Sequence, residues 1–166
     1  ALESAAPSFQ HVPVAQLPVV DLAGSVRVRV LVGEAFGARS PVRTASPTLY
    51  LDLQLPAGAA CTLPALAPEM ALFSPEQSLR VDAQPLAAQV MAVLPAASGA
   101  ALQAGPQGAR IVVIGGAPLE RPVQMWWNFV ATDRERIGAA AMRWAAGGFD
   151  GIAGETDRVA APPWRG

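Results

Sequence analysis

The strongest constraint on the fold is a segment in which leucine alternates with other, mostly polar residues. From residue 48 to residue 55 the sequence reads Thr-Leu-Tyr-Leu-Asp-Leu-Gln-Leu. Successive side chains of a strand point to opposite faces, so one face of this segment is all leucine and the other is largely polar. The pattern predicts a half-buried antiparallel strand. Pro56-Ala57-Gly58 then ends the strand with turn-forming residues.

A second alternating segment lies upstream, where valine occupies positions 26, 28, 30 and 32. Two strands that each have one apolar face need a closed or sandwiched core. Short apolar runs follow at residues 61–63, 70–73, 79–81, 90–94, 100–103 and 110–114, with Gly, Pro or Asp between most of them. A spacing of about ten residues per strand and turn is typical of a small all-β barrel or sandwich. The predicted fold is therefore all-β and antiparallel, jelly-roll-like, with one C-terminal helix.

The pattern changes near the C-terminus. The aromatic run Val123–Val130 is expected to be a last strand, and the segment Gly33–Pro41 a loop. Thr132 followed by Glu135 has the pattern of a capping box, and apolar residues at helical spacing then predict a helix over 133–146 that ends at Gly147. We expect residues 1–18 to be a linker or arm, 19–131 the barrel, 132–147 a helix packed on the barrel, and 148–166 a tail.

Composition narrows the classes of function. The 166 residues are 52% hydrophobic and 15% charged, which argues against disorder, and a net charge of −1 offers no footprint for nucleic acid. All twelve basic residues are Arg, which we attribute to genomic composition. No apolar run approaches the ~18 residues that a membrane span needs, and no signal pattern opens the chain. A cytoplasmic, bacterial protein is the expectation.

Few residues of this sequence could take part in catalysis. Cys61 is the sole cysteine, so we expect a small buried hydrophobe rather than a thiolate site. His11 is the sole histidine and lies in the arm, where no nucleophile motif accompanies it. Glu34 and Glu69 could act as general acid and base, but isolated carboxylates on a barrel are usually solvated. We therefore predict no catalytic residue in this chain.

The order of several motifs resembles the second half of pirin-like proteins. The motifs are Gly33–Gly37, Ser40–Val42, Pro47–Asp52, Leu55–Gly58, Gly115–Leu119, Pro122-Val123, Trp127–Val130, Glu135–Ile137, Gly148-Phe149 and Gly154-Glu155. The resemblance implies a bicupin, in which two antiparallel β-barrels stand in tandem. It also implies that the first barrel, which has no counterpart in this sequence, holds a metal, usually iron, on histidines and one glutamate. The family is linked to quercetin 2,3-dioxygenase activity and to partner proteins that include transcription factors.

The barrel of this chain lacks a ligand set of its own. A cupin metal site needs about three imidazoles and a carboxylate that converge inside the barrel. The first cupin motif would follow Gly58, where residues 64–69 offer only Glu69, and the second would place a histidine near residues 89–92, where there is none. We expect neither a metal nor another cofactor in this chain.

The aromatic cluster Trp126, Trp127 and Phe129 is the most informative apolar feature. If the run is one strand, Trp126 and Asn128 share one face, and Trp127 and Phe129 the other. Either face could fill the core or cover a domain interface. Together with Phe36, the three aromatic residues are our predicted interface. Arg27, Arg29 and Arg43 are expected to form a solvated polar stripe.

Three hypotheses of function follow. The first is a metal-free C-terminal cupin half that serves as structural and interaction partner of a metal-bearing half. The second is part of a quercetin 2,3-dioxygenase-like oxidoreductase, and the third is a regulatory protein-binding module. The expected partner is the N-terminal cupin half or a second copy related by a two-fold axis, with neither nucleic acid nor membrane involved.

Overall fold

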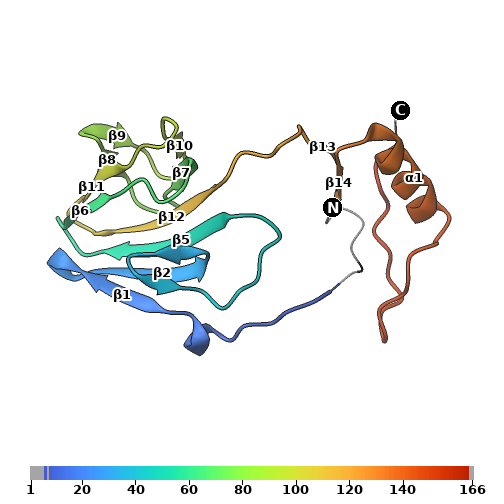
Figure 1. Cartoon of the computed structure of the whole chain (residues 1–166), viewed down its shortest axis with the longest axis horizontal. Helices are drawn as coiled ribbons and strands as arrows, with labels where there is room; N and C mark the ends of the chain where they lie inside the picture. Colours follow the sequence, from blue (N-terminus) through green and yellow to red (C-terminus); the bar gives the residue numbers. More distant parts are fainter. Residues whose placement is uncertain (1–5, 7, 165–166) are drawn as a thin grey trace. The chain divides into compact units, whose positions relative to one another are not determined.

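The computed structural model describes residue 6 and residues 8–164, which form two compact units (Figure 1). The first unit runs to Pro118 and contains the two large β-sheets. The second begins at Leu119 and contains a two-stranded hairpin and the helix. The expected packing of the helix on the barrel stays a prediction.

The first unit is a sandwich of two antiparallel sheets. The larger sheet contains, in spatial order, β1 (Val19–Leu22), β2 (Val26–Val32), β5 (Thr48–Leu55), β12 (Ala109–Gly116), β7 (Glu69–Phe73) and β10 (Met91–Val93). The smaller sheet contains β6 (Ala60–Leu63), β11 (Ala100–Ala104), β8 (Leu79–Val81) and β9 (Gln84–Leu86). The predicted all-β antiparallel fold is confirmed, and the leucine segment is a strand over the predicted residues.

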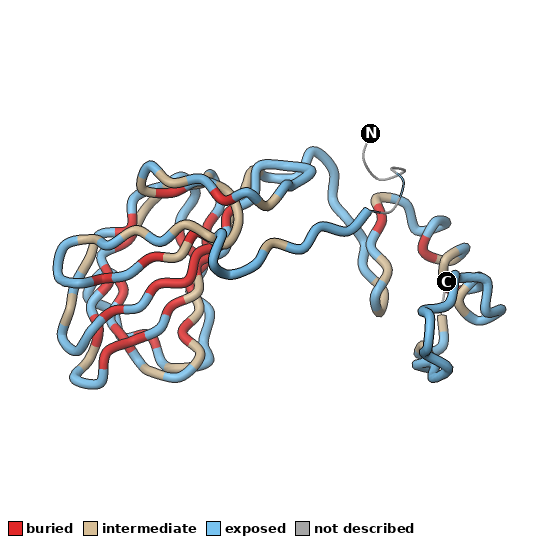
Figure 2. The backbone as a smooth tube through the Cα atoms, turned by 90° about the horizontal axis from the view of Figure 1, so that it is seen from below, coloured by how far each residue is buried: buried red, intermediate tan, exposed pale blue. Residues whose placement is uncertain are grey.

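Alternation in the strands places the core between the two sheets. The four leucines of β5 and the valines at 26, 28 and 30 are at most 4% exposed. They meet Leu63, Leu102 and Leu79 from the smaller sheet in one apolar cluster. Figure 2 shows the buried residues in red along these strands. The long strands β2, β5 and β12 therefore each bury one face, as the period of two requires.

Two short hairpins replace predicted loops. Within the expected loop 33–41, β3 (Glu34–Ala35) pairs with β4 (Ala38–Arg39) around Phe36-Gly37, both of which have positive φ. Within the expected turn after Val81, only Asp82-Ala83 turn, again with positive φ, and Pro85 lies in β9. Two-residue turns of this kind match the twist of a hairpin. Pro85 is tolerated because β9 is an edge strand.

Regular secondary structure begins within the segment 1–18, which was expected to be a linker or arm. A short 3-10 helix spans Val14–Gln16, β1 includes Asp21, and the chain turns at the 3-10 segment Ala23–Ser25. The side chain of Gln10 donates to the carbonyl of Pro41 and accepts from the amide of Arg43, which ties the arm to the sandwich. Residues 1–5 and 7 of the predicted 1–18 arm lie outside the described residues.

In the second unit the aromatic run is not one strand, which corrects the prediction. β13 (Gln124–Trp126) and β14 (Phe129–Ala131) form a hairpin around Trp127-Asn128. Trp127 has φ 51°, so the chain reverses where continuous alternation was expected. Trp126 pairs with Phe129 across the hairpin, and these two rings, rather than those of Trp127 and Phe129, are register partners.

Helix α1 (Arg134–Ala145) confirms the predicted helix, but its cap differs. The N-cap is Asp133, whose carboxylate accepts from the amide of Glu135, rather than Thr132. At the other end Gly147 has φ 73°, and the amides of Gly147 and Gly148 donate to the carbonyls of Trp144 and Arg143. This is a Schellman motif, the glycine-dependent stop that the sequence predicts. Among the described residues no helix is long and apolar enough to cross a membrane.

Gly33 provides a test of the fold. Gly33 and Gly37 both have positive φ, but an added Cβ at Gly33 would lie 2.3 Å from the carbonyl oxygen of Thr48, whereas nothing lies within 4 Å at Gly37. We expect Gly37→Ala to lower the free energy of unfolding by about 1–2 kcal/mol, the cost of the left-handed backbone alone. Gly33→Ala should lower the free energy of unfolding, measured by chemical denaturation, by a clearly larger amount. Equal losses would contradict the close approach of the two backbones.

Candidate functional site

The interior of the sandwich offers no ligand set. Its inner faces carry Val, Leu, Ile, Met and Ala, and the buried polar residues of the described chain are Ser40, Asp52 and Ser74. The hydroxyls of Ser40 and Ser74 donate to backbone carbonyls. Of the residues considered for chemistry, His11 and Glu69 are exposed. Nowhere in the described residues do three His, Cys, Asp or Glu side chains gather as a metal site would require.

Cys61 lies on β6, half-buried against the core. Burial raises the pKa of its thiol by desolvation of the thiolate. The thiol is therefore held in its protonated form at neutral pH, which does not suit a nucleophile. This position fits the expected hydrophobic role.

The outer face of the larger sheet carries an apolar patch. Two neighbouring cross-strand rows build it: Asp52, Val112, Phe73 and Met91 in one, and Tyr50, Ile114, Ala71 and Val93 in the other. We call the six large residues of these rows the outer-face patch: Tyr50, Phe73, Met91, Val93, Val112 and Ile114. Val93 is 78% exposed, Met91 51% and Ile114 41%. Contiguous exposed apolar side chains of this kind mark interaction surfaces.

A charged group borders the patch. Asp52 is 6% exposed, and its two carboxylate oxygens accept from Nε and a terminal nitrogen of Arg110 at 2.9 and 3.1 Å. This hydrogen bonding raises the pKa of the Arg110 guanidinium above its ordinary value. Arg29 lies opposite Asp52 on β2, and its buried Nε has no hydrogen-bond acceptor among the described residues. The outer face thus combines apolar side chains with a fixed ion pair and an unsatisfied donor.

The predicted aromatic residues gather in the second unit. The rings of Trp126 and Phe129 stack with centroids 6.2 Å apart, and Trp127 meets Phe129 edge to face at 5.8 Å. Trp144 of α1 lies 5.1 Å from Trp127, and Phe149 and Trp164 of the tail complete the cluster. The three predicted rings are each half-buried by these contacts. Their role as an interface stays a prediction.

The remaining predicted residues lie apart from this cluster. Phe36 belongs to the first unit, where it packs against the core from the β3–β4 turn. Glu34 forms an ion pair with Arg39 on the neighbouring strand. Arg27 lies near Asp21 at 3.9 Å, and Arg43 is exposed. These charges are surface groups with local partners or solvent.

The outer-face patch is not evident from the sequence. Alternation places Tyr50 on a largely polar face, and the runs 90–94 and 110–114 predict only strands. The patch exists because strands far apart in sequence pair in one register, and that register is not visible in any single strand. A signal was present in residues 110–114, where both faces of the strand are apolar apart from Arg110.

Comparisons with known proteins agree with this architecture. The family model for the pirin C-terminal cupin domain matches residues 50–150. The chain is 34% identical to a pirin-like protein of Caulobacter vibrioides over 85% of its own length and 48% of that protein. It is 32% identical to mouse pirin over 88% of its length and 53% of that protein. The chain therefore spans about half the length of the curated relatives it matches.

A solved structure extends the comparison. The crystal structure of quercetin 2,3-dioxygenase from Acinetobacter baumannii superposes with a TM-score of 0.79 at 29% sequence identity. The match covers 89% of this chain and 50% of that chain. This similarity and the family match confirm the expected cupin-type fold.

The buried carboxylate provides a test of the outer face. We expect Asp52→Ala to lower the free energy of unfolding by roughly 1–3 kcal/mol, because it leaves the Arg110 guanidinium without its acceptor. Gln54→Ala, two residues on and exposed on the same face, should change it by less than about 0.5 kcal/mol. Urea unfolding measures both. A loss at Asp52 no larger than at Gln54 would contradict a structural ion pair.

Proposed function

The chain belongs to the pirin family, and we propose that it acts there as a metal-free cupin half whose task is to bind a second cupin domain. In this proposal the interior of the sandwich provides stability, and function resides on the outer surface. The second domain is the metal-bearing N-terminal half implied by the family, or another copy of this chain. We also propose that the protein works in the cytoplasm.

The aliphatic interior carries the proposal. Iron in a cupin needs nitrogen and oxygen donors that converge in the barrel. The inner faces of β5 and β12 instead present leucine, isoleucine, valine and alanine, and the residues of this chain do not fit an iron ion. Any iron of a two-cupin protein would depend on the other half.

The outer-face patch supports the binding role. Solvated faces of antiparallel sheets normally carry polar residues. Here the centre of the face is apolar, and the ion pair of Asp52 and Arg110 lies at its border. An apolar centre with polar groups at its border is the usual anatomy of a protein interface.

A second candidate function is favoured by the similarity to the Acinetobacter quercetin 2,3-dioxygenase. In that case this chain would be the supporting half of a dioxygenase whose chemistry occurs in the other cupin domain. Oxygen uptake with quercetin separates the two candidates. Activity is expected only from a protein that contains both halves, and turnover by this chain alone would contradict the proposal.

Metal content is the direct test of the first proposal. The purified chain, incubated with Fe²⁺ and desalted, should retain far less than one equivalent of iron, since no converging donors are present in the described part of the chain. Inductively coupled plasma mass spectrometry measures the ratio, with a His/Glu-ligated cupin treated in parallel as the positive control. One tightly held ion per chain would overturn the proposal.

The oligomeric state of the chain tests whether the outer-face patch is an interaction surface. We expect the chain alone to dimerise as its concentration rises, and Ile114→Glu to weaken the dimer at least about tenfold, because a carboxylate would enter the centre of an apolar interface. Met142→Glu, at a residue that is 68% exposed on α1, is the matched control and should leave the dimer unchanged. Sedimentation equilibrium measures both. Equal weakening by the two variants would show that the patch is not the contact.

A further inference from the structure

One edge of the larger sheet lacks the features that usually protect a sheet edge. β10 is the last strand of that sheet, and in the described part of the chain it pairs on one side, with β7 (Figure 1). Exposed edges are normally kept apart by charged side chains, prolines or a covering segment. The sequence has no charged residue between positions 83 and 109, and β10 contains no proline. The free edge of β10 is therefore open to pairing with another strand.

The other three edges of the two large sheets each have a protecting feature. β1 contains Asp21, and β9 contains Pro85. β6 lies beside the 3-10 segment Ala23–Ser25, where an added Cβ at Gly24 would lie 3.8 Å from the carbonyl oxygen of Ala60. Of the four edges, β10 is therefore the one at which we expect strand pairing.

The backbone groups of Met91 and Val93 point away from β7. The amide of Leu94 donates to the carbonyl of Met70 at 3.0 Å, in the register of the β10–β7 ladder. Because hydrogen-bonded pairs alternate along an antiparallel ladder, Ala92 also directs its N–H and C=O groups toward β7. The N–H and C=O groups of Met91 and Val93 then face the free edge, where they provide two donors and two acceptors.

This edge is complementary to a second copy of itself. A two-fold axis at Ala92 places Met91 of one copy opposite Val93 of the other, and both residues have outward-facing backbone groups. The two pairs can exchange four hydrogen bonds across the axis. The two alanines meet at the position without hydrogen bonds, where side chains approach most closely and a small residue fits.

The side chains favour the same pairing. Met91 and Val93 are 51% and 78% exposed, and across the axis each would pack beside the other. On the opposite face of the sheet, Val90 of one copy would lie opposite Leu94 of the other. The rows of the outer-face patch that end at Met91 and Val93 would continue from one copy into the next. No charge enters the contact, because the segment 83–109 carries none.

From this arrangement we infer that two copies of the chain pair through β10, antiparallel and about a two-fold axis at Ala92, so that their larger sheets join into one. The inference rests on the proposed function in taking a second copy as the partner, but its contact is separate. The edge contact lies in the plane of the sheet, whereas the outer-face patch lies on its face, so both can be occupied together. A strand of three residues makes a small contact, and we expect a weak dimer.

Nuclear magnetic resonance of the full chain tests the pairing at the residues concerned. The chain carries Ile114→Glu, which disables the proposed face contact, and is compared at micromolar and millimolar concentrations. We expect the amides of Met91 and Val93 to shift and to exchange with solvent more slowly as the concentration rises, because they enter hydrogen bonds across the axis. The amides of Val19 and Asp21 point to the opposite edge of the sheet and should not change.

A pair of variants at position 93, made in the same Ile114→Glu chain, tests the backbone hydrogen bonds. Val93→Pro removes an outward N–H group without removing a bond to β7, and should weaken the dimer at least about tenfold. Val93→Thr keeps the N–H group and the β-branched shape, and should change the dissociation constant less than about threefold. Sedimentation equilibrium measures both.

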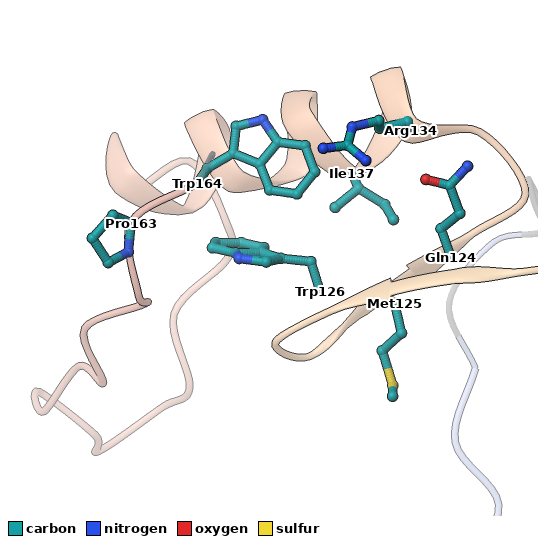
Figure 3. A pocket seen from close by; sticks show the side chains of 7 residues that line it. All are labelled: Gln124, Met125, Trp126, Arg134, Ile137, Pro163 and Trp164. Atoms are coloured by element: carbon teal, nitrogen blue, oxygen red, sulfur yellow. The ribbon is translucent and has the colours of Figure 1, made fainter. Parts of the chain in front are cut away.

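A second pair of variants tests the absence of charge. Met91→Lys should weaken the dimer at least about tenfold, because a lysine on an edge strand opposes pairing. Met125→Lys is the matched control and should leave the dimer unchanged. Met125 is 75% exposed on β13 of the second unit, and its side chain points away from α1 (Figure 3).

The outcomes separate this inference from the proposed function. A chain with Ile114→Glu that stays monomeric at millimolar concentration would overturn the edge contact and leave the face contact standing. If Ile114→Glu does not weaken the dimer of the natural chain but Val93→Pro does, the face contact fails and the edge contact stands. Equal effects of Val93→Pro and Val93→Thr, or of Met91→Lys and Met125→Lys, would also overturn the inference. The amide spectrum shows whether each variant is folded, and Met91→Lys replaces Val93→Pro if that variant unfolds.

Discussion

The structure depends on one strand, β5, whose side chains alternate between the two faces of the sheet and which pairs with a neighbouring strand along each edge. β5 pairs with β2 along one edge and with β12 along the other, and its four leucines are at most 4% exposed. Because side chains alternate, a shift of one residue would send every leucine to solvent. The register of β5 therefore determines which residues of β2 and β12 face the core, and through β12 it determines those of β7 and β10.

The same alternation accounts for where function can reside. The positions that point inward are aliphatic among the described residues, and such side chains carry no donor atoms for a metal. The positions that point outward include Asp52, whose charge can be kept in a partly buried place only because Arg110 lies on the next strand to receive it. This is why the proposed binding role is assigned to the outer face of the sheet.

Much of the fold could be predicted because its signals are local. The leucine and valine periodicity identified β5 and β2, and Gly147 identified the end of α1. The features that were missed depend on non-local choices. Trp127 adopts a left-handed backbone inside a run that has the composition of a strand, and the capping position moved by one residue because Asp133 competes with Thr132. The outer-face patch required the pairing of four strands, which no local pattern reveals.

The second unit is stabilised by different contacts from those of the sandwich. A hairpin of six paired residues and a twelve-residue helix bury little aliphatic surface, since Ile137 and Ala141 are the buried residues of α1. Rings replace that surface: Trp126, Trp144 and Phe149 meet their neighbours at centroid distances of 5.1 to 6.4 Å. Arginine guanidinium groups extend the stack, with Arg143 over Phe149 at 4.6 Å and Arg158 over Trp144 at 4.9 Å. Because such ring pairs favour offset or edge-to-face geometry, the positions of the hairpin, the helix and the tail within this unit are set by the orientations of a few rings.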